Sequence, residues 1–340
     1  MQVNLKGSPT RFADGVKKAA KSAFWTGVHS FKGASNFSGT PRLASFPFIS
    51  CDTYRSISNV IISRDFNSEE LADIRLGPGH EIIYVEVSFL KSFGGGTPLL
   101  QWLELSDFSS ASVIIHNGDW IPDSEYLSSL ASTGVRVFCV NTLDGIPGVT
   151  PIPVGLENVI RGKNGALEDF HLYYDLKRRP HVGDTLRDNI IFSAFKTATN
   201  RPVREPLAEM LAKSRHGFSS TRLSVSHFRR QVLKSNFVMS PPGNGPDCYR
   251  TWEAIYLGAV PIVLRNTLAD SLAADLPIWV VDSWEEVFDA TDTQLSEKYL
   301  AIKEAPDDKA FFPHWIAEIG DPQPTPKSPE ISYLKSSGYS

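Results

Sequence analysis

The stretch "SPPGNG", residues 240–245, joins an apolar run to a helical pattern and is the part of the chain best suited to hold an anion. Gly243 and Gly245 lack a Cβ atom, so a ligand can approach the backbone and positive φ is permitted. Asp247 is expected to act as the N-cap of the helix that follows. The free N–H groups and the dipole at that helix start favour a phosphate. Most glycine turns before helices bind nothing, so the neighbouring residues must show whether this turn binds an anion.

Two charged residues follow the turn, and they change its interpretation. Arg250 and Glu253 lie three residues apart on one helical face. The guanidinium offers a fork of donors that suits phosphate or carboxylate, and the carboxylate can accept from the two hydroxyls of a ribose. The alternative is an ordinary ion pair within the helix. Trp252 and Tyr256 are expected to pack in the core rather than to stack on a base.

The elements that must position these residues alternate between short apolar strands and helical segments, which predicts parallel βαβ units with both sheet faces covered. Predicted strands cover 58–63, 81–90, 111–119, 135–140 and 149–155, and then 189–195, 236–240, 260–264 and 277–281. Predicted helices cover 122–132, 202–214, 227–235, 247–257, 283–290, 293–304 and 307–319. A polar, charge-mixed stretch at 168–188, within a predicted linker near 160–188, separates two α/β halves.

This organisation predicts four parts. They are a basic helix with an irregular lead-in (1–55), a first Rossmann-like domain (56–165), a second one that carries the glycine turn (185–305), and a C-terminal helix with a flexible tail (306–340). In parallel α/β sheets, ligands bind beyond the carboxyl ends of the strands. "HNGD" (116–119) and "GLEN" (155–158) therefore join the glycine turn as candidate site segments.

Composition narrows the class of protein. The 340 residues carry a formal net charge of -4, which argues against nucleic acid as a partner. The three cysteines form no CxxC pair, and the eight histidines show no metal-ligand spacing, so no metal site is expected. The N-terminus lacks the apolar run of a signal peptide, and no apolar run approaches 18 residues, which leads us to expect a cytoplasmic protein.

The N-terminal segment has a local charge bias. Residues 1–32 carry six Lys or Arg side chains against one Asp. A helix over residues 11–28 would be basic and amphipathic. It is either an ordinary solvated helix packed on the body, the simpler interpretation, or a peripheral contact with an anionic membrane surface at the inner face.

The longest motif resembles a known family. "FVMSPPGNGPDCYRTWEAIYLGAVPIVLRN" (237–266) is similar to the nucleotide-sugar-binding signature of exostosin-like glycosyltransferases of the GT-B fold. "VIIHNGDW" (113–120) and "TPIPVGLEN" (150–158) resemble companion motifs of bacterial and viral members, so the resemblance covers roughly residues 110–266. Members often carry His where this chain has Tyr249, which puts a His–phosphate role there in doubt.

The resemblance implies an α/β GT-B fold, with two Rossmann-like domains facing each other across a cleft and C-terminal helices packing back. It implies that the loop faces the diphosphate of a nucleotide-sugar donor, that Arg250 neutralises this diphosphate, and that Glu253 binds the ribose. The loop residues concerned are Ser240, Pro241, Gly243, Asn244 and Gly245. Such enzymes generally need no catalytic metal, and no further cofactor is expected. Further phosphate candidates, which would otherwise be part of a solvated loop and helix start, are Lys196, Asn200 and Arg204.

The acceptor and its general base are expected from the first half. A sugar hydroxyl that attacks an anomeric carbon must lose its proton, and Asp119, His116 and Glu157 each follow a predicted strand. Asp119 is the first choice, because His116 could be a satisfied core histidine and Glu157 could cap the next segment. The function expected is transfer of a sugar, with inversion, from a nucleotide diphosphate, UDP first, to a glycan or lipid-linked acceptor.

Three other functions are alternatives. A transferase with two similar halves but a different donor, such as a polysaccharide pyruvyl transferase, would share the fold and would be separated by nucleotide binding. A non-catalytic module for nucleotides or glycans would bind nucleotide but transfer nothing. An NAD-dependent dehydrogenase is disfavoured, because no predicted strand leads into a GxGxxG motif.

Overall fold

The structure is a computed structural model. It describes residues 45–63, 66, 68–77, 79–92, 96–108, 110–143, 145–158, 167–177, 187–216 and 223–320. The predicted basic helix at 11–28 and the predicted tail from 321 onward lie outside these residues, as does much of the predicted linker. Within the described ranges, no helix is both long enough and apolar enough to cross a membrane.

The first half of the described chain forms a five-stranded parallel sheet with the strands in sequence order. Its strands are β1 (Val60–Ile62), β2 (His80–Glu86), β3 (Ser110–His116), β4 (Arg136–Val140) and β5 (Val149–Ile152). Its helices are α2 (Cys51–Ser56), α3 (Ser68–Asp73), α4 (Val87–Ser92), α5 (Thr97–Leu105) and α6 (Ser124–Ser132). After their first residues, β2 and β3 are buried throughout, as expected of a parallel sheet covered on both faces.

The second half forms a four-stranded parallel sheet, again in sequence order. Its strands are β6 (Asn189–Phe192), β7 (Ser235–Met239), β8 (Val260–Leu264) and β9 (Trp279–Val281). Its helices are η4 (Thr197–Thr199), α8 (Arg201–Lys213), α9 (Val225–Leu233), α10 (Tyr249–Tyr256), α11 (Thr267–Ala273), α12 (Glu285–Asp289) and α13 (Asp292–Ile302). Val238 of β7 lies in the core shared with α9 and α10, whereas Phe237 and Met239 lie in the core shared with α8 and α13.

Side-chain oxygens mark where several of these helices begin. Asp123 accepts from the backbone of α6, Ser224 from that of α9, and Asn266 from that of α11. The start of α10 differs, because its N-cap residue, Cys248, makes no side-chain capping bond. The sequence prediction that Asp247 is this N-cap was wrong by one residue: the Asp247 carboxylate is directed to other partners, described below.

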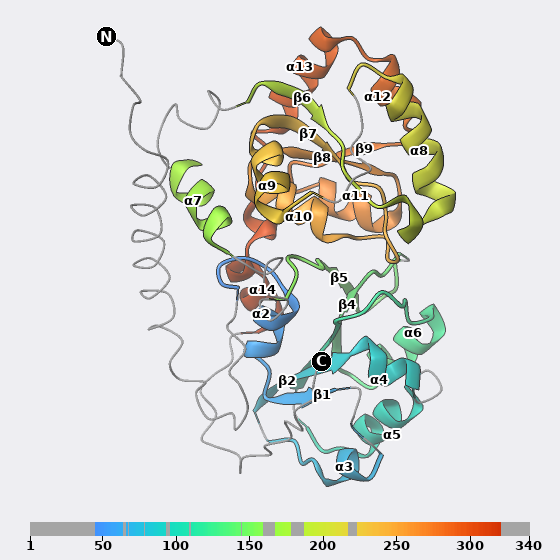
Figure 1. Cartoon of the computed structure of the whole chain (residues 1–340). Helices are drawn as coiled ribbons and strands as arrows, with labels where there is room; N and C mark the ends of the chain where they lie inside the picture. The colour runs from blue at the N-terminus through green and yellow to red at the C-terminus, as the bar shows by residue number, and fades with distance from the viewer. Residues whose placement is uncertain are drawn as a thin grey trace.

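Helix α2, from the start of the described chain, and α14 (Phe312–Ile319), from its end, lie together between the sheets (Figure 1). Just before α14 comes η5 (Asp308–Ala310), and α7 (Glu168–Lys177) packs against α10 of the second half. The Tyr256 ring of α10 lies 4.8 Å from Phe48 and 5.7 Å from Phe311, and its hydroxyl donates to the Ala310 carbonyl at 2.6 Å. Farther along α14, the Ile319 carbonyl accepts from the Ser112 hydroxyl of β3 at 2.9 Å. The chain therefore returns from the second sheet to the first.

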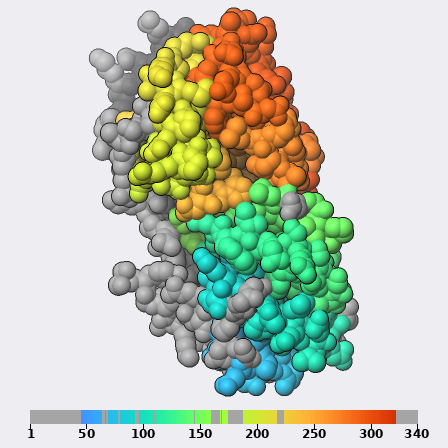
Figure 2. All heavy atoms as spheres, turned by 90° about the vertical axis from the view of Figure 1, so that its right-hand side faces the viewer, coloured from blue at the N-terminus to red at the C-terminus, as the bar shows by residue number. Residues whose placement is uncertain are grey.

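The two halves touch along a broad junction in the space-filling view, where the cyan and green residues of the first sheet meet the yellow and orange residues of the second (Figure 2). The prediction of a mixed α/β protein with parallel strands is confirmed, and the two sheets are consistent with Rossmann-like halves. Two local predictions were wrong. The apolar run 81–90 turns from strand to helix after Glu86, and the predicted linker contains α7.

Candidate functional site

Three strand-end segments meet at the junction between the halves. Residues 116–119 follow β3, residues 155–158 follow β5, and the glycine loop 240–245 follows β7. The Asn244 side-chain amide of the loop donates to the Asp119 carboxylate at 3.0 Å. The carboxyl ends of both sheets therefore face this junction, which is where ligands bind in parallel α/β proteins.

Hydrogen bonds from side chains at the start of α8 hold the glycine loop in place. The Arg204 guanidinium donates to three carbonyls, those of Pro242 at 2.9 Å, Lys196 at 3.0 Å and Pro241 at 3.1 Å. The Asn200 amide donates to the Gly243 carbonyl at 2.9 Å. These two side chains, expected as phosphate ligands, therefore bind the loop backbone and draw its carbonyls toward α8.

Arg204 is buried, and its environment is unusual for a guanidinium. Burial lowers its pKa to about 10, and the nearby positive charge of Arg250 acts in the same direction. Lys196, the third candidate of this group, is exposed, and its backbone carbonyl accepts from Arg204. Two arginines therefore lie beside the loop, and one of them, Arg204, already donates its hydrogen bonds to backbone carbonyls.

The two glycines serve different purposes. Neither has positive φ, although a glycine would permit it. A Cβ atom on Gly245 would lie 2.8 Å from the Asn141 amide nitrogen, so this glycine allows Asn141 of the first half to approach. A Cβ on Gly243 would lie 3.3 Å from Nη2 of Arg204, a tighter contact than usual that requires the guanidinium to shift by a few tenths of an ångström.

Helix α10 presents unused donors to the junction. Within the described part of the chain, no backbone acceptor faces the N–H groups of Tyr249 and Arg250 in its first turn, and no side chain caps it. The Arg250 Nε donates to the Ala194 carbonyl at 3.1 Å, which fixes the guanidinium beside the end of β6. Positive charge and free N–H groups are therefore concentrated next to the glycine loop.

Glu253 lies one turn farther along α10 and is largely shielded from water. Burial raises the pKa of its carboxyl, while Arg229 and then Arg250 lower it, and Glu157 of the first half raises it. Burial raises the pKa of the Tyr249 hydroxyl, and the negative charges of Glu157 and Asp119 act in the same direction. A glutamate from the second half therefore lies near the Glu157 carboxylate of the first half, and Tyr249 lies near both first-half carboxylates.

His116 is occupied within the protein. Its Nε2 is 3.0 Å from the Pro153 carbonyl, and its Nδ1 accepts the Asn117 backbone N–H at 2.8 Å. This pattern fixes a neutral ring with its proton on Nε2, and burial lowers the pKa of the imidazole to about 4. With both ring nitrogens engaged, His116 is placed as a satisfied core histidine, the alternative that the sequence left open.

The remaining base candidates keep accessible carboxylates. Asp119 is exposed and accepts from Asn244 of the glycine loop. Glu157 is half-buried, and its Oε1 accepts from the Asn158 backbone at 3.1 Å. Both carboxylates therefore lie at the junction, and Asp119 contacts the loop directly.

Sequence reasoning missed the way Asp247 joins the halves. Its carboxylate accepts from the Val154 backbone of the first half at 2.8 Å, from the Trp252 indole at 2.9 Å and from the Cys248 backbone at 2.8 Å. Burial raises its pKa to about 6, against the pull of these three donors. Its own N–H donates to Asn141 at 3.3 Å. An aspartate two residues before a helix gives no sequence signal for such distant partners.

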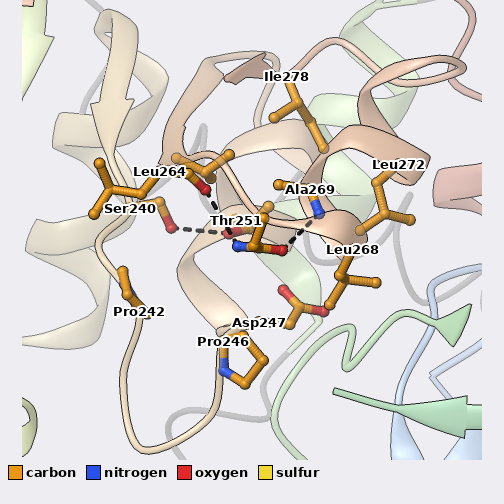
Figure 3. Close-up of a pocket in the computed structure, with 12 residues that line it drawn as sticks. Ser240, Pro242, Pro246, Asp247, Thr251, Leu264, Leu268, Ala269, Leu272 and Ile278 are labelled. Carbon is orange, nitrogen blue, oxygen red and sulfur yellow. Dashed lines mark hydrogen bonds between the residues drawn. The ribbon is translucent and has the colours of Figure 1, made fainter. Parts of the chain in front are cut away.

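A small pocket adjoins the loop at the carboxyl ends of β7 and β8, between α10 and α11 (Figure 3). Its lining is mostly apolar and includes Leu264, Leu268 and Ile278. At its edge the Ser240 hydroxyl and the Thr251 hydroxyl are hydrogen-bonded at 2.8 Å. In the described residues, no cluster of three or more His, Cys, Asp or Glu side chains is arranged to hold a metal ion.

A comparison with known protein families covers part of this site. Residues 203–287 match a family model described as the RXYLT1 C-terminal domain, which is related to xylosyltransferases. The match favours a glycosyltransferase-type function for this region. The matched segment includes the glycine loop, α10, Arg250 and Glu253, but none of the first-half residues at the junction. No curated protein matches the chain.

Proposed function

We propose that this chain is a metal-independent glycosyltransferase of the GT-B type that uses a nucleotide-diphosphate sugar, UDP-sugar first. The observation that carries the proposal is the uncapped start of α10 beside the glycine loop, within the matched segment. A helix start with free N–H groups and an adjacent arginine suits the phosphates of a donor. The return of α14 to the first sheet is in keeping with the GT-B arrangement.

In this proposal the donor is held by α10. Arg250 and the first N–H groups of α10 bind the diphosphate and stabilise the charge that develops on it as the glycosidic bond breaks. The Glu253 carboxylate accepts hydrogen bonds from the ribose hydroxyls. Arg204 and Asn200 contribute indirectly, because they fix the loop carbonyls away from the anion.

On the acceptor side, we propose Asp119 as the general base of an inverting transfer, with a glycan or lipid-linked hydroxyl as nucleophile. Its carboxylate faces the donor loop at 3.0 Å from Asn244, so it lies across the junction from the diphosphate position. Glu157 is the second candidate, because it also faces the junction. His116 is not proposed, since both its ring nitrogens are engaged.

Nucleotide binding tests the donor assignment. Addition of millimolar UDP or GDP should raise the melting temperature, because a ligand at 100 times its Kd stabilises a protein by about 2.7 kcal/mol. Arg250→Ala should lose this rise when compared with its own ligand-free melting temperature. Arg201→Ala, which removes an exposed arginine of α8, is the matched control and should keep the rise. The proposal is wrong if neither nucleotide stabilises the protein, or if Arg250→Ala responds like the unmodified chain.

A further inference from the structure

One buried cation lies beside the proposed donor site and is not among the residues proposed to bind the donor. Arg229 of α9 is only 1% exposed. Its guanidinium carbon lies 4.2 Å from the centre of the Phe170 ring, and its Nη1 is 3.3 Å from the Asp169 carboxylate. Its Nε is 3.8 Å from Oε1 of Glu253. Arg229 therefore connects α7, α9 and α10.

The two carboxylates around Arg229 are in different environments. The Asp169 side chain is 44% exposed, so water can solvate its charge. The Glu253 side chain is 18% exposed, so its charge depends much more on neighbouring cations. The separation of 3.8 Å is an ion-pair distance but longer than a good hydrogen bond, so Glu253 can still accept hydrogen bonds from a ligand.

The charges that face Glu253 come from three elements. Arg229 on α9 and Arg250 on α10 itself favour the ionised carboxylate, whereas Glu157 beyond β5 opposes it. Arg250 is also the proposed diphosphate ligand, so a bound donor would neutralise part of its charge. Arg229 is buried against Phe170 and stays beside Glu253 whether or not the donor is bound.

We propose that Arg229 is a positioning residue for the donor: from outside the glycine loop, it holds Glu253 as an oriented anion that accepts the ribose hydroxyls. The Phe170 ring and Asp169 fix the plane of the guanidinium, so α7 belongs to the support of the site. This inference rests on the proposed function, because it assumes that Glu253 binds a ribose. It adds a residue that would act only through Glu253.

The affinity of the full chain for UDP, measured by calorimetry between pH 5.5 and 8.5, tests the inference. The unmodified chain should bind with little change over this range. Arg229→Met leaves Glu253 buried without its main cation, so its carboxylate should take up a proton near neutral pH. The affinity of this variant should fall about tenfold from pH 8 to pH 6, because only the ionised carboxylate accepts the ribose hydroxyls. Arg229→Lys, which keeps the charge, should restore a nearly flat profile with weaker binding.

Two controls separate positioning from damage to the fold. Arg230→Met changes the adjacent, exposed arginine of α9 and should behave like the unmodified chain. A 2′,3′-dideoxy analogue of UDP offers Glu253 no ribose hydroxyls, so its weaker binding to Arg229→Met should show no added dependence on pH. If Arg229→Met does not fold, the comparison of Arg229→Lys with the unmodified chain decides, because a weaker and flat profile for UDP but unchanged affinity for the analogue is expected.

The inference is overturned if Arg229→Met keeps the affinity and profile of the unmodified chain. It is also overturned if UDP and the analogue lose affinity equally at every pH, or if Arg229→Lys binds UDP as the unmodified chain does. A different result would remove the proposed function itself: the unmodified chain would bind neither UDP nor the analogue at any pH, and the inference would fall with it.

Discussion

At the carboxyl end of β3, His116 and Asp119 are three residues apart but have different environments. The imidazole is bonded through both nitrogens inside the first half, whereas the carboxylate reaches the glycine loop of the second half. Residue type and position after a strand made both of them candidates in the sequence, with Asp119 the first choice. Burial and hydrogen bonding separate them, since a proton acceptor needs a free lone pair within reach of substrate.

The buried imidazole makes a testable contribution to stability. Because the pKa of His116 falls to about 4 in the folded state, the unfolded chain binds a proton between pH 6.5 and 4 that the folded chain does not. The stability from His116 is therefore present above pH 6.5 and lost as the pH falls through 4, by up to about 3 kcal/mol. In His116→Asn, which does not titrate there, the difference in unfolding free energy from the unmodified chain should shrink by about this amount between pH 7 and 4.

Denaturant unfolding of both proteins at each pH measures this difference. Contributions of other groups to the unfolding free energy are the same in both proteins and cancel. Asp247 is one of them: its pKa is raised to about 6, so its contribution has the opposite sign and is lost as the pH rises. A difference that stays constant from pH 7 to pH 4 would show that the imidazole is not the buried, neutral group described here.

For single residues, the sequence predicted the position correctly where the residue lies near its own motif. Arg250 and Glu253 lie beside the loop, as their helical spacing predicted. Arg204 and Asn200 also lie there, but they bind loop carbonyls, because backbone direction cannot be read from residue types. Asp247 was misread because its partner Val154 is 93 residues away, and no local pattern reports such a contact.

Among the elements, the glycine loop is a place where the two halves are in direct contact. Asn141, after β4, fits against Gly245 and bonds the Gly118 carbonyl at 3.1 Å and the Asp247 N–H at 3.3 Å. The conformation of Asn141 is itself unusual, with φ of 62°. The loop is therefore fixed by α8 on one side and by the first half on the other.

Alanine substitution of the two glycines should give different results. In Gly245→Ala the new Cβ displaces the buried Asn141 amide and breaks its two hydrogen bonds, which should lower the free energy of unfolding by about 1–3 kcal/mol. In Gly243→Ala the new Cβ requires only a small shift of the Arg204 guanidinium, 3.3 Å away, and φ is not positive, so the loss should be smaller, about 1 kcal/mol or less. Thermal or urea unfolding of both variants measures this, and equal losses would contradict the assigned role of Gly245.

Most elements of both sheets could be predicted from the alternation of apolar runs and helical patterns. The exceptions have physical causes. The run 81–90 is mostly apolar, and periodicity cannot separate a buried strand from a buried helix over so short a length. The α7 sequence is polar and charge-mixed, but Phe170 places one buried ring against Phe48 and Tyr256, which a composition argument does not detect.

For the whole molecule, the order of strands along the chain predicted two parallel sheets, but not how their edges meet. How they meet depends on hydrogen bonds between residues far apart in the sequence. The Phe312 N–H donates to the Pro47 carbonyl at 2.8 Å, and the Val154 N–H donates to the Asp247 carboxylate. These contacts turn the carboxyl ends of both sheets toward one junction. A donor bound by α10 would therefore face Asp119 and Glu157 without a large rearrangement of either half.

The measurement that tests the central claim most directly is the release of free nucleoside diphosphate from a panel of nucleotide sugars, offered with glycan and lipid-linked acceptors. The unmodified chain should release nucleotide from at least one donor. Arg250→Ala should be slower by a factor of about 10²–10³, the usual effect of removing one group that stabilises charge in the transition state, and Asp119→Asn should still bind the donor but transfer little. Release from no donor, or equal rates for the unmodified chain and Arg250→Ala, would contradict the assignment of this junction as the active site of a glycosyltransferase.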